Sequence, residues 1–177
     1  MRPLFSRLRR FFRTEQGNAS IEFVLLFPIF FTLLASTFEL SAITIRGSML
    51  ERAVDLAVRD IRLGTGSAPQ HDAIKQAVCD RAPIIRDCTN NLRVEMFHAD
   101  PVNWVEPSAQ ADCTDLSEEV QPVRRFENGL DNELMIIRVC AKIGTLFPTV
   151  GLGNVVQKDD NGQVALVAAS AFVQEPR

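Results

Sequence analysis

The sequence predicts an α+β protein whose long N-terminal membrane-spanning helix continues into an amphipathic helix packed on a small antiparallel sheet domain. Three observations predict this class: an early apolar run, a seven-residue apolar repeat directly after it, and alternating strand-like segments further on. They divide the chain into a basic leader (1–17), a transmembrane helix (18–39), an amphipathic extension (40–64) and an exported α+β domain (65–177).

Charge is distributed unevenly along the 177 residues. The first 16 residues carry five Arg and one Glu, a net charge of +4, whereas the remainder carries 14 basic and 21 acidic residues, a net charge of −7. An acidic body repels phosphate groups, which argues against a nucleic-acid-binding function. Basic residues resist translocation, so the leader is expected to stay in the cytoplasm while the body is exported.

The apolar run from Ile21 to Phe38 is long enough, with its flanks, to span a bilayer as a helix. A cleavable signal peptide is the alternative, but its apolar core usually has only about 7–15 residues before a small-residue cleavage site. The segment Ala35-Ser36-Thr37 matches such a site poorly. A retained anchor is therefore favoured, and Pro28 within it predicts a kink.

Glu22 is the only charged residue in this run. A carboxylate in hydrocarbon costs at least ~2.5–3.5 kcal/mol on insertion scales, so it requires a partner or a function. If the chain is cut after Gly17, Asn18 becomes the N-terminus, and its amine lies one helical turn from Glu22 or from the Glu22 of a neighbouring helix. Alternatively, Glu22 simply reaches the cytoplasmic interface. Glu39 lies ~26 Å further along the helix, so the two acids would bracket the hydrocarbon, each near a water interface.

The helix is expected to continue to Gly64-Thr65-Gly66, a C-cap signal. Apolar or small residues recur here at alternating spacings of four and three, which places them on one face. This face comprises Ile43, Gly47, Leu50, Val54, Ala57 and Ile61. Two uses for it remain open: packing on the chain's own domain, which is the commoner case, and a seam with other subunits.

The exported part predicts a compact mixed domain. A short helix is expected at 70–78, and strands are expected at 92–97, half-buried, and at 134–143. The dipeptide Asn161-Gly162 predicts a hairpin that joins Val155-Val156 to the apolar segment that follows the turn.

Residues 99–122 are rich in acids and proline, which predicts a long irregular excursion. Trp104 lies within it between two valines. We expect the indole to anchor this excursion in the core, with contact to a partner as the alternative.

Four cysteines, Cys79, Cys88, Cys113 and Cys140, all follow the apolar run. An even number in an exported domain suggests two disulfides, for which three connectivities exist. No C-x2-C pair is present, which argues against a structural zinc site. We favour Cys79–Cys88 with Cys113–Cys140, which would tie the long excursion to the main strand; the other pairings and free buried thiols remain open.

The sequence predicts no catalytic, cofactor or metal site. His71 and His98 are the only histidines, and neither belongs to a metal-binding or triad pattern. The segment Gly151-Leu152-Gly153-Asn154 is too short to predict a phosphate-binding loop. We therefore expect neither an enzyme nor a binder of a small-molecule substrate.

The N-terminal part of the chain has four features in a fixed order. A basic leader comes first, then Gly17, then the segment 18–23 (Asn-Ala-Ser-Ile-Glu-Phe), and finally a long apolar helix that ends at Phe38-Glu39. Over residues 13–64 this order resembles the TadE/TadF-like minor pilins, or pseudopilins, of the tight-adherence (Flp) pilus. The first mature residue of common type IV pilins is aromatic, whereas this chain has Asn18 at that position. This departure favours the tight-adherence branch.

The resemblance implies cleavage after Gly17 by a prepilin peptidase, with Glu22, Phe23 and Glu39 involved in maturation or assembly. It further implies other pilin subunits, the pilus assembly machinery and inner-membrane lipid as partners. The N-terminus would be cytoplasmic and the C-terminal domain periplasmic, and the subunit could enter an extracellular pilus used for adhesion. The alternative is an unprocessed, single-pass membrane-anchored periplasmic module for binding or scaffolding.

Overall fold

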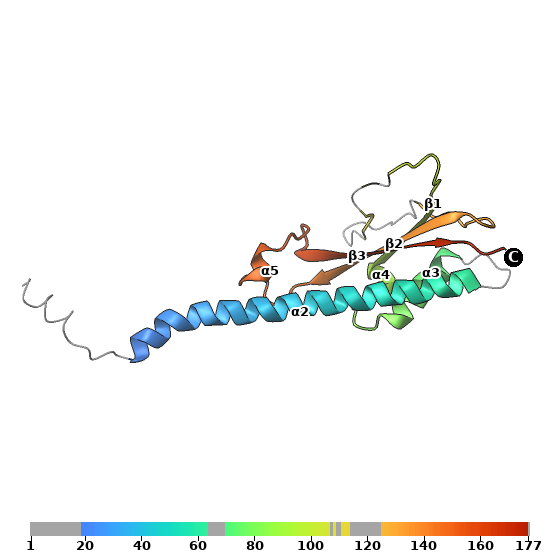
Figure 1. The fold of residues 1–177 in the computed structure, drawn as a ribbon. Helices are drawn as coiled ribbons and strands as arrows, with labels where there is room; N and C mark the ends of the chain where they lie inside the picture. The colour runs from blue at the N-terminus through green and yellow to red at the C-terminus, as the bar shows by residue number, and fades with distance from the viewer. Residues whose placement is uncertain (1–18, 64–69, 107, 109–110, 114–124, 177) are drawn as a thin grey trace, which may run out of the picture.

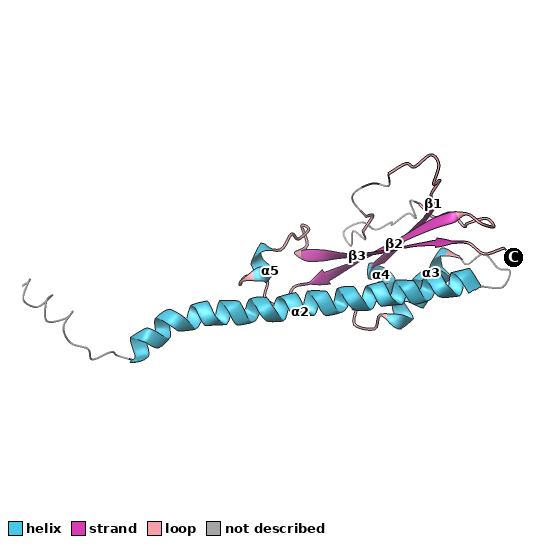
Figure 2. Ribbon diagram, in the orientation of Figure 1, coloured by secondary structure: helices cyan, strands magenta, loops and turns pink. Residues whose placement is uncertain are grey.

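The computed structural model describes residues 19–63, 70–106, 108, 111–113 and 125–176. A long helix runs beside a three-stranded sheet, and its N-terminal part projects beyond the rest of the protein (Figures 1 and 2). This arrangement confirms the α+β class. In chain order the elements are α2 (Ala19–Leu63), α3 (His71–Arg81), α4 (Cys88–Asn91), β1 (Leu92–His98), β2 (Leu134–Gly144), α5 (Leu152–Val155) and β3 (Gln163–Val173).

The sheet is antiparallel, in the order β1-β2-β3. Leu92 of β1 lies opposite Ala141 of β2, and Met135 of β2 lies opposite Phe172 of β3. Because side chains alternate between the two faces of a strand, this register places one apolar set from each strand on the face toward α2 and α3. The strands expected at 92–97 and 134–143 are thus confirmed, each extended by one residue.

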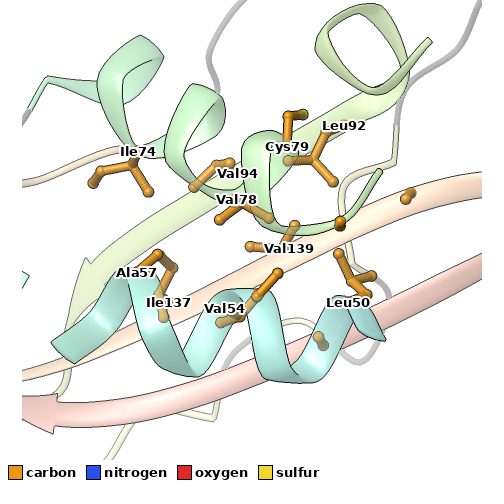
Figure 3. Close-up of a cluster of buried hydrophobic side chains, with 14 of the residues drawn as sticks. Leu50, Val54, Ala57, Ile74, Val78, Cys79, Leu92, Val94, Ile137 and Val139 are labelled. Carbon is orange, nitrogen blue, oxygen red and sulfur yellow. The ribbon is translucent and has the colours of Figure 1, made fainter. Parts of the chain in front are cut away.

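The C-terminal half of α2 packs on the chain's own sheet (Figure 3). Leu50, Val54, Ala57 and Ile61 are buried in the core, and Ile43 is partly buried beside it. Full burial of a side chain such as Leu50 contributes about 1.5–3 kcal/mol. The structure thus places most of this apolar face in contacts within one chain. Gly47 differs, since a Cβ built there would meet no atom within 4 Å.

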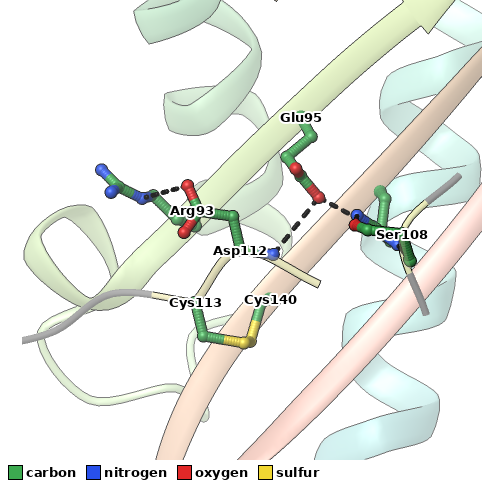
Figure 4. Close-up of polar contacts among 7 residues, drawn as sticks. Arg93, Glu95, Ser108, Asp112, Cys113 and Cys140 are labelled. Carbon is green, nitrogen blue, oxygen red and sulfur yellow. Dashed lines mark hydrogen bonds and ion pairs between the residues drawn. A yellow bond between two sulfur atoms is a disulfide. The ribbon is translucent and has the colours of Figure 1, made fainter. Parts of the chain in front are cut away.

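Both disulfides have the favoured pairing. Cys79–Cys88 connects the end of α3 to α4, with Cα atoms 5.6 Å apart. Cys113–Cys140 connects the excursion to the middle of β2, with Cα atoms 5.2 Å apart. The second bond fixes part of the excursion to the sheet face that α2 does not cover (Figure 4).

Two ion pairs occupy the same sheet face, so β1 is buried on both sides rather than half-buried. Arg138 Nε lies 2.7 Å from Glu95 Oε2, and its Nη1 donates to the Ser108 carbonyl at 2.7 Å. Arg93 Nε lies 3.4 Å from Asp112 Oδ2. The excursion therefore covers charged side chains that pair with one another and with the excursion itself (Figure 4).

The predicted hairpin between Val155-Val156 and the segment after Asn161-Gly162 is wrong. Val155 ends the short helix α5, and β3 pairs along its whole length with β2 instead. The turn itself is present, with Gly162 at a positive φ of 72°. The hairpin signal identified the turn correctly, but the long apolar β2 offers β3 an eleven-residue partner that the short valine segment does not.

The expectation that Trp104 anchors the excursion is also wrong, because its side chain is 56% exposed. The Asp100 carboxylate accepts hydrogen bonds from the backbone N–H groups of Val102 and Asn103. This local turn competes with burial of the segment. The neighbouring Val102 and Val105 are exposed as well.

Asp159 organises the turn before β3 and makes its stability pH-dependent. Burial opposes ionisation of its carboxyl, but the Lys142 ammonium and the backbone N–H groups of Gln163 and Asn161 outweigh it, so the pKa lies below the ordinary 3.8. A carboxyl whose pKa is lower in the folded than in the unfolded chain stabilises the fold at pH values above its unfolded pKa. This stabilisation is lost as the pH falls through the pKa of the folded state.

Asp159→Asn should therefore lower the melting temperature at neutral pH, and the difference from wild type should shrink as pH falls from about 5 through the lowered pKa of the Asp159 carboxyl. Circular dichroism of the detergent-solubilised protein measures this. The exposed neighbour is the control: Asp160→Asn should leave the melting temperature at neutral pH close to that of wild type. A difference for Asp159→Asn that is equal at both ends of the range would contradict the assignment.

Candidate functional site

The candidate functional site is the N-terminal half of α2 and its junction with the head domain, the folded part from residue 70 onward. Within the described part of the chain, α2 is the one helix long and apolar enough to cross a membrane, judged by length and composition. Its large apolar side chains from Ile21 to Leu34 are exposed. These side chains are available for contact with lipid or with another helix.

Aromatic side chains follow one face of this exposed segment. The rings of Phe23 and Phe27 stack with centroids 5.0 Å apart, and those of Phe27 and Phe31 with centroids 6.0 Å apart. Side chains four residues apart are neighbours on a helix, which explains the row. Pro28 lies inside the helix, and the Thr32 hydroxyl donates to the Pro28 carbonyl at 2.7 Å. The N-terminal turns bend away from the remaining helix axis (Figure 1).

Gly17 and Asn18, the expected processing site, lie outside the described residues. Glu22 lies in the first turn of α2, with its side chain exposed among apolar neighbours. A carboxylate in the first turn interacts favourably with the helix dipole. Phe23 beside it is 61% exposed.

Glu39 lies in quite different surroundings. We expected it near a water interface, but its side chain is fully buried. Its Oε2 accepts hydrogen bonds from the backbone N–H groups of Leu146 and Phe147, each at 2.8 Å, and Oε1 accepts from Leu146 at 3.1 Å. The carboxylate is therefore solvated by protein backbone rather than by water, in charge-assisted hydrogen bonds.

The segment that covers Glu39, residues 145–157, is here called the ledge. It follows β2, contains α5 and lies along α2 between Thr32 and Glu39. Ser36 Oγ accepts the backbone N–H of Leu152 at 3.1 Å. Ser36 and Glu39, which lie about one turn apart on α2, thus each accept hydrogen bonds from backbone N–H groups of the ledge. These bonds hold the ledge against the helix.

Two glycines allow the ledge to approach α2 closely. Gly151 has a positive φ of 56°, and an added Cβ there would overlap Ser36 Oγ. A Cβ on Gly153 would overlap the Phe147 carbonyl oxygen and lie 3.0 Å from Glu39 Oε2. Sequence reasoning considered these glycines only as a phosphate-binding loop. The ledge carries no charged residue, but neither does the segment 161–174 that contains β3, so the absence of charge alone does not identify the ledge.

Gly153→Ala should displace the ledge from α2 and cost about 1–3 kcal/mol, as overpacking of a tight contact does. Hydrogen exchange followed by mass spectrometry should show faster exchange of the Leu146 and Phe147 amides. Gly144→Ala is the control, because a Cβ there meets no atom within 4 Å. Equal exchange rates in Gly153→Ala and wild type would mean that the glycine is not required for the contact.

The two histidines lie apart. His71 begins α3, its Nδ1 lies 2.8 Å from Asp72 Oδ1, and its ring packs edge-on against Phe126. His98 ends β1 and is exposed. Among the described residues, no group of three His, Cys, Asp or Glu side chains is arranged to hold a metal ion.

Comparison with known families adds one result. The model of the family described as TadE-like protein matches residues 17–59, which comprise the glycine before Asn18, the exposed apolar segment and most of the amphipathic part of α2. Comparisons with curated proteins and with solved structures give no match. A TadE-like protein belongs to the tight-adherence pilus system, which fits a helix built to anchor a folded head in a membrane. By this N-terminal segment, the chain is similar to TadE-like proteins.

Proposed function

We propose that the protein is a minor pilin, or pseudopilin, that a prepilin peptidase cleaves after Gly17. The pilus assembly machinery then incorporates it with other pilin subunits into a tight-adherence (Flp) pilus for surface attachment. Glu22 carries the proposal: it is the one charge on the exposed segment from Ala19 to Phe38 and lies five residues beyond Gly17. The subunit itself performs no catalysis; the peptidase supplies the chemistry.

The proposed location is the inner membrane, with a cytoplasmic N-terminus and a periplasmic head. Two features support this orientation. The leader carries a charge of +4, which resists translocation. Both disulfides lie in the head, and disulfides persist in oxidising compartments such as the periplasm.

Cleavage would change the charge balance at the cytoplasmic end of α2. It removes the leader and creates an α-amino group on Asn18, which would lie ~6 Å from Glu22 along the axis if Asn18 continued the helix. The amine of the same or a neighbouring subunit can then neutralise the Glu22 carboxylate. Transfer of the apolar segment from lipid into a filament becomes less costly, because the one charge among residues 19–38, Glu22, moves as part of a pair.

The N-terminus of the mature protein tests the processing step. Intact-mass measurement of protein purified from membranes should give a chain that begins at Asn18, and Gly17→Val should retain Met1. The same measurement reports both disulfides as the loss of four hydrogen atoms from the mass of the reduced chain. A wild-type protein that keeps Met1 would contradict the proposal and support the unprocessed, membrane-anchored module. A chain that begins after residue 38 would contradict both.

Glu22→Ala should leave membrane insertion and cleavage unchanged while strongly reducing the amount of subunit in pili sheared from the cell surface. The reason is that the Asn18 amine loses its acceptor. Immunoblots of membrane and sheared fractions measure the two effects separately. The matched control is Glu51→Ala, which removes an exposed acid from the same helix beside the head. If both variants assemble like wild type, the amine–carboxylate pair is not required.

A further inference from the structure

We propose that the ledge, residues 145–157, inserts into the outer half of the bilayer, directly below the phospholipid headgroups, so that the head is seated in the membrane surface instead of standing clear of it. The inference depends on the proposed function only in that α2 must be embedded in a membrane. It concerns a different part of the chain, far from the processing site, and assigns the ledge a lipid partner.

The first argument is length. At 1.5 Å per residue, Thr32 lies ~15 Å and Glu39 ~26 Å along the helix axis from Glu22. The hydrocarbon core is ~30 Å thick. If Glu22 marks its inner boundary, the segment between Thr32 and Glu39 lies within its outer half. The ledge is hydrogen-bonded along that segment, so it must share the same depth.

The second argument is surface chemistry. The ledge contains no Asp, Glu, Lys or Arg. Two of its apolar side chains face outward, Leu146 at 50% exposure and Val155 at 80%. On the neighbouring surface of α2, Phe38 and Leu40 are also exposed, at 62% and 55%. Exposed apolar side chains are therefore present on both the anchor and the ledge, and the charged residues beside the ledge, such as Arg46 and Lys158, belong to the flanking segments.

The third argument concerns the backbone. Irregular backbone at membrane depth is tolerated only where its polar groups are satisfied by the protein or lie in water. In the ledge, the N–H groups of Leu146 and Phe147 bond Glu39, and that of Leu152 bonds Ser36. Lys158 Nζ donates to the carbonyls of Pro148 and Gly153 from the ledge's end.

Within the ledge, three further backbone N–H groups bond ledge carbonyls: Val150 to Phe147, Asn154 to Gly151 and Val156 to Leu152. The fold thus removes much of the desolvation cost that would keep an ordinary loop out of lipid. It also explains why an acid can lie at this depth, since Glu39 is enclosed by the ledge and never meets hydrocarbon.

Depth-dependent fluorescence quenching tests the proposal. The full-length protein with Trp104→Phe, which removes the one native Trp, is reconstituted into phosphatidylcholine vesicles with or without brominated acyl chains. Val155→Trp reports on the ledge, Phe30→Trp on the anchor, and Val167→Trp on the exposed outer face of β3. We expect brominated lipid to reduce the emission of the Val155 and Phe30 probes and to leave that of the Val167 probe unchanged.

The outcomes separate this inference from the proposed function. Quenching at Phe30 without quenching at Val155 would overturn the ledge proposal alone, whether water or a second protein subunit covers the ledge. No quenching at either position would show that α2 is not embedded, and both proposals would fall. Quenching at Val167 as strongly as at Val155 would mean that the head contacts lipid without preference for the ledge, which also overturns the proposal.

Discussion

Arg138→Ala should lower the free energy of unfolding of the head domain by about 3–5 kcal/mol, the cost of removing one partner of a buried ion pair. The Glu95 and Arg138 side chains are only 10% and 12% exposed, and Arg138 also donates to the Ser108 carbonyl. Truncation would leave the Glu95 carboxylate buried without its cation. Urea unfolding of the detergent-solubilised protein, followed by near-ultraviolet circular dichroism, measures the loss.

An exposed pair provides the control for this prediction. Arg62 Nη2 lies 3.0 Å from Glu175 Oε1, with both side chains about half exposed. Arg62→Ala should cost less than about 1 kcal/mol, as exposed pairs do. A double variant, Glu95→Leu with Arg138→Met, should recover much of the lost stability, because neither charge then remains unpaired. If Arg138→Ala lowers the free energy of unfolding no more than Arg62→Ala does, the buried ion pair does not stabilise the head domain.

The features that the sequence predicted well are those that depend on neighbours along the chain. The apolar run, the four-three spacing of Leu50, Val54, Ala57 and Ile61, and the alternation in β2 are each properties of one segment. The disulfides were predictable because few pairings exist for four cysteines. In each case a short segment and its periodicity determine the structure.

The features that the sequence did not predict depend on contacts between distant segments. Val155-Val156 was expected in a strand because valine favours strands. In the structure β3 pairs with β2 instead, and the short helix α5 packs against α2. Trp104 was expected inside on its hydrophobicity, yet the turn formed by Asp100 directs its segment outward. The charges of Arg93 and Glu95 indicated a solvated face, whereas the excursion covers them.

Glu39 shows most clearly why part of the candidate site required the structure. An acid at the end of an apolar run has an ordinary explanation, which is that it marks the water boundary. Its actual donors are 107 and 108 residues away in the chain. Only the course of β2, which returns the chain to α2 just before Leu146, brings them together. The candidate site is therefore larger than its N-terminal sequence signature.

Glu39→Leu should cost about 2–6 kcal/mol, because the buried N–H groups of Leu146 and Phe147 each lose their acceptor, at about 1–3 kcal/mol per group. The ledge should detach from α2 while the sheet remains folded. Hydrogen exchange should thus accelerate at residues 145–153 and stay unchanged in β1 and β2. Urea unfolding of the same samples gives the global loss.

Glu39→Gln separates the role of the acceptor from that of the charge. The amide oxygen can still accept the two N–H groups, so a loss well below that of Glu39→Leu is expected, with ledge exchange close to wild type. Glu51→Leu, at an exposed position further along the same helix, is the matched control and should change neither measurement. If Glu39→Leu leaves exchange in the ledge at the wild-type rate, the carboxylate does not hold the ledge against α2. The head would then have to be attached to its anchor by the core around Leu50 alone.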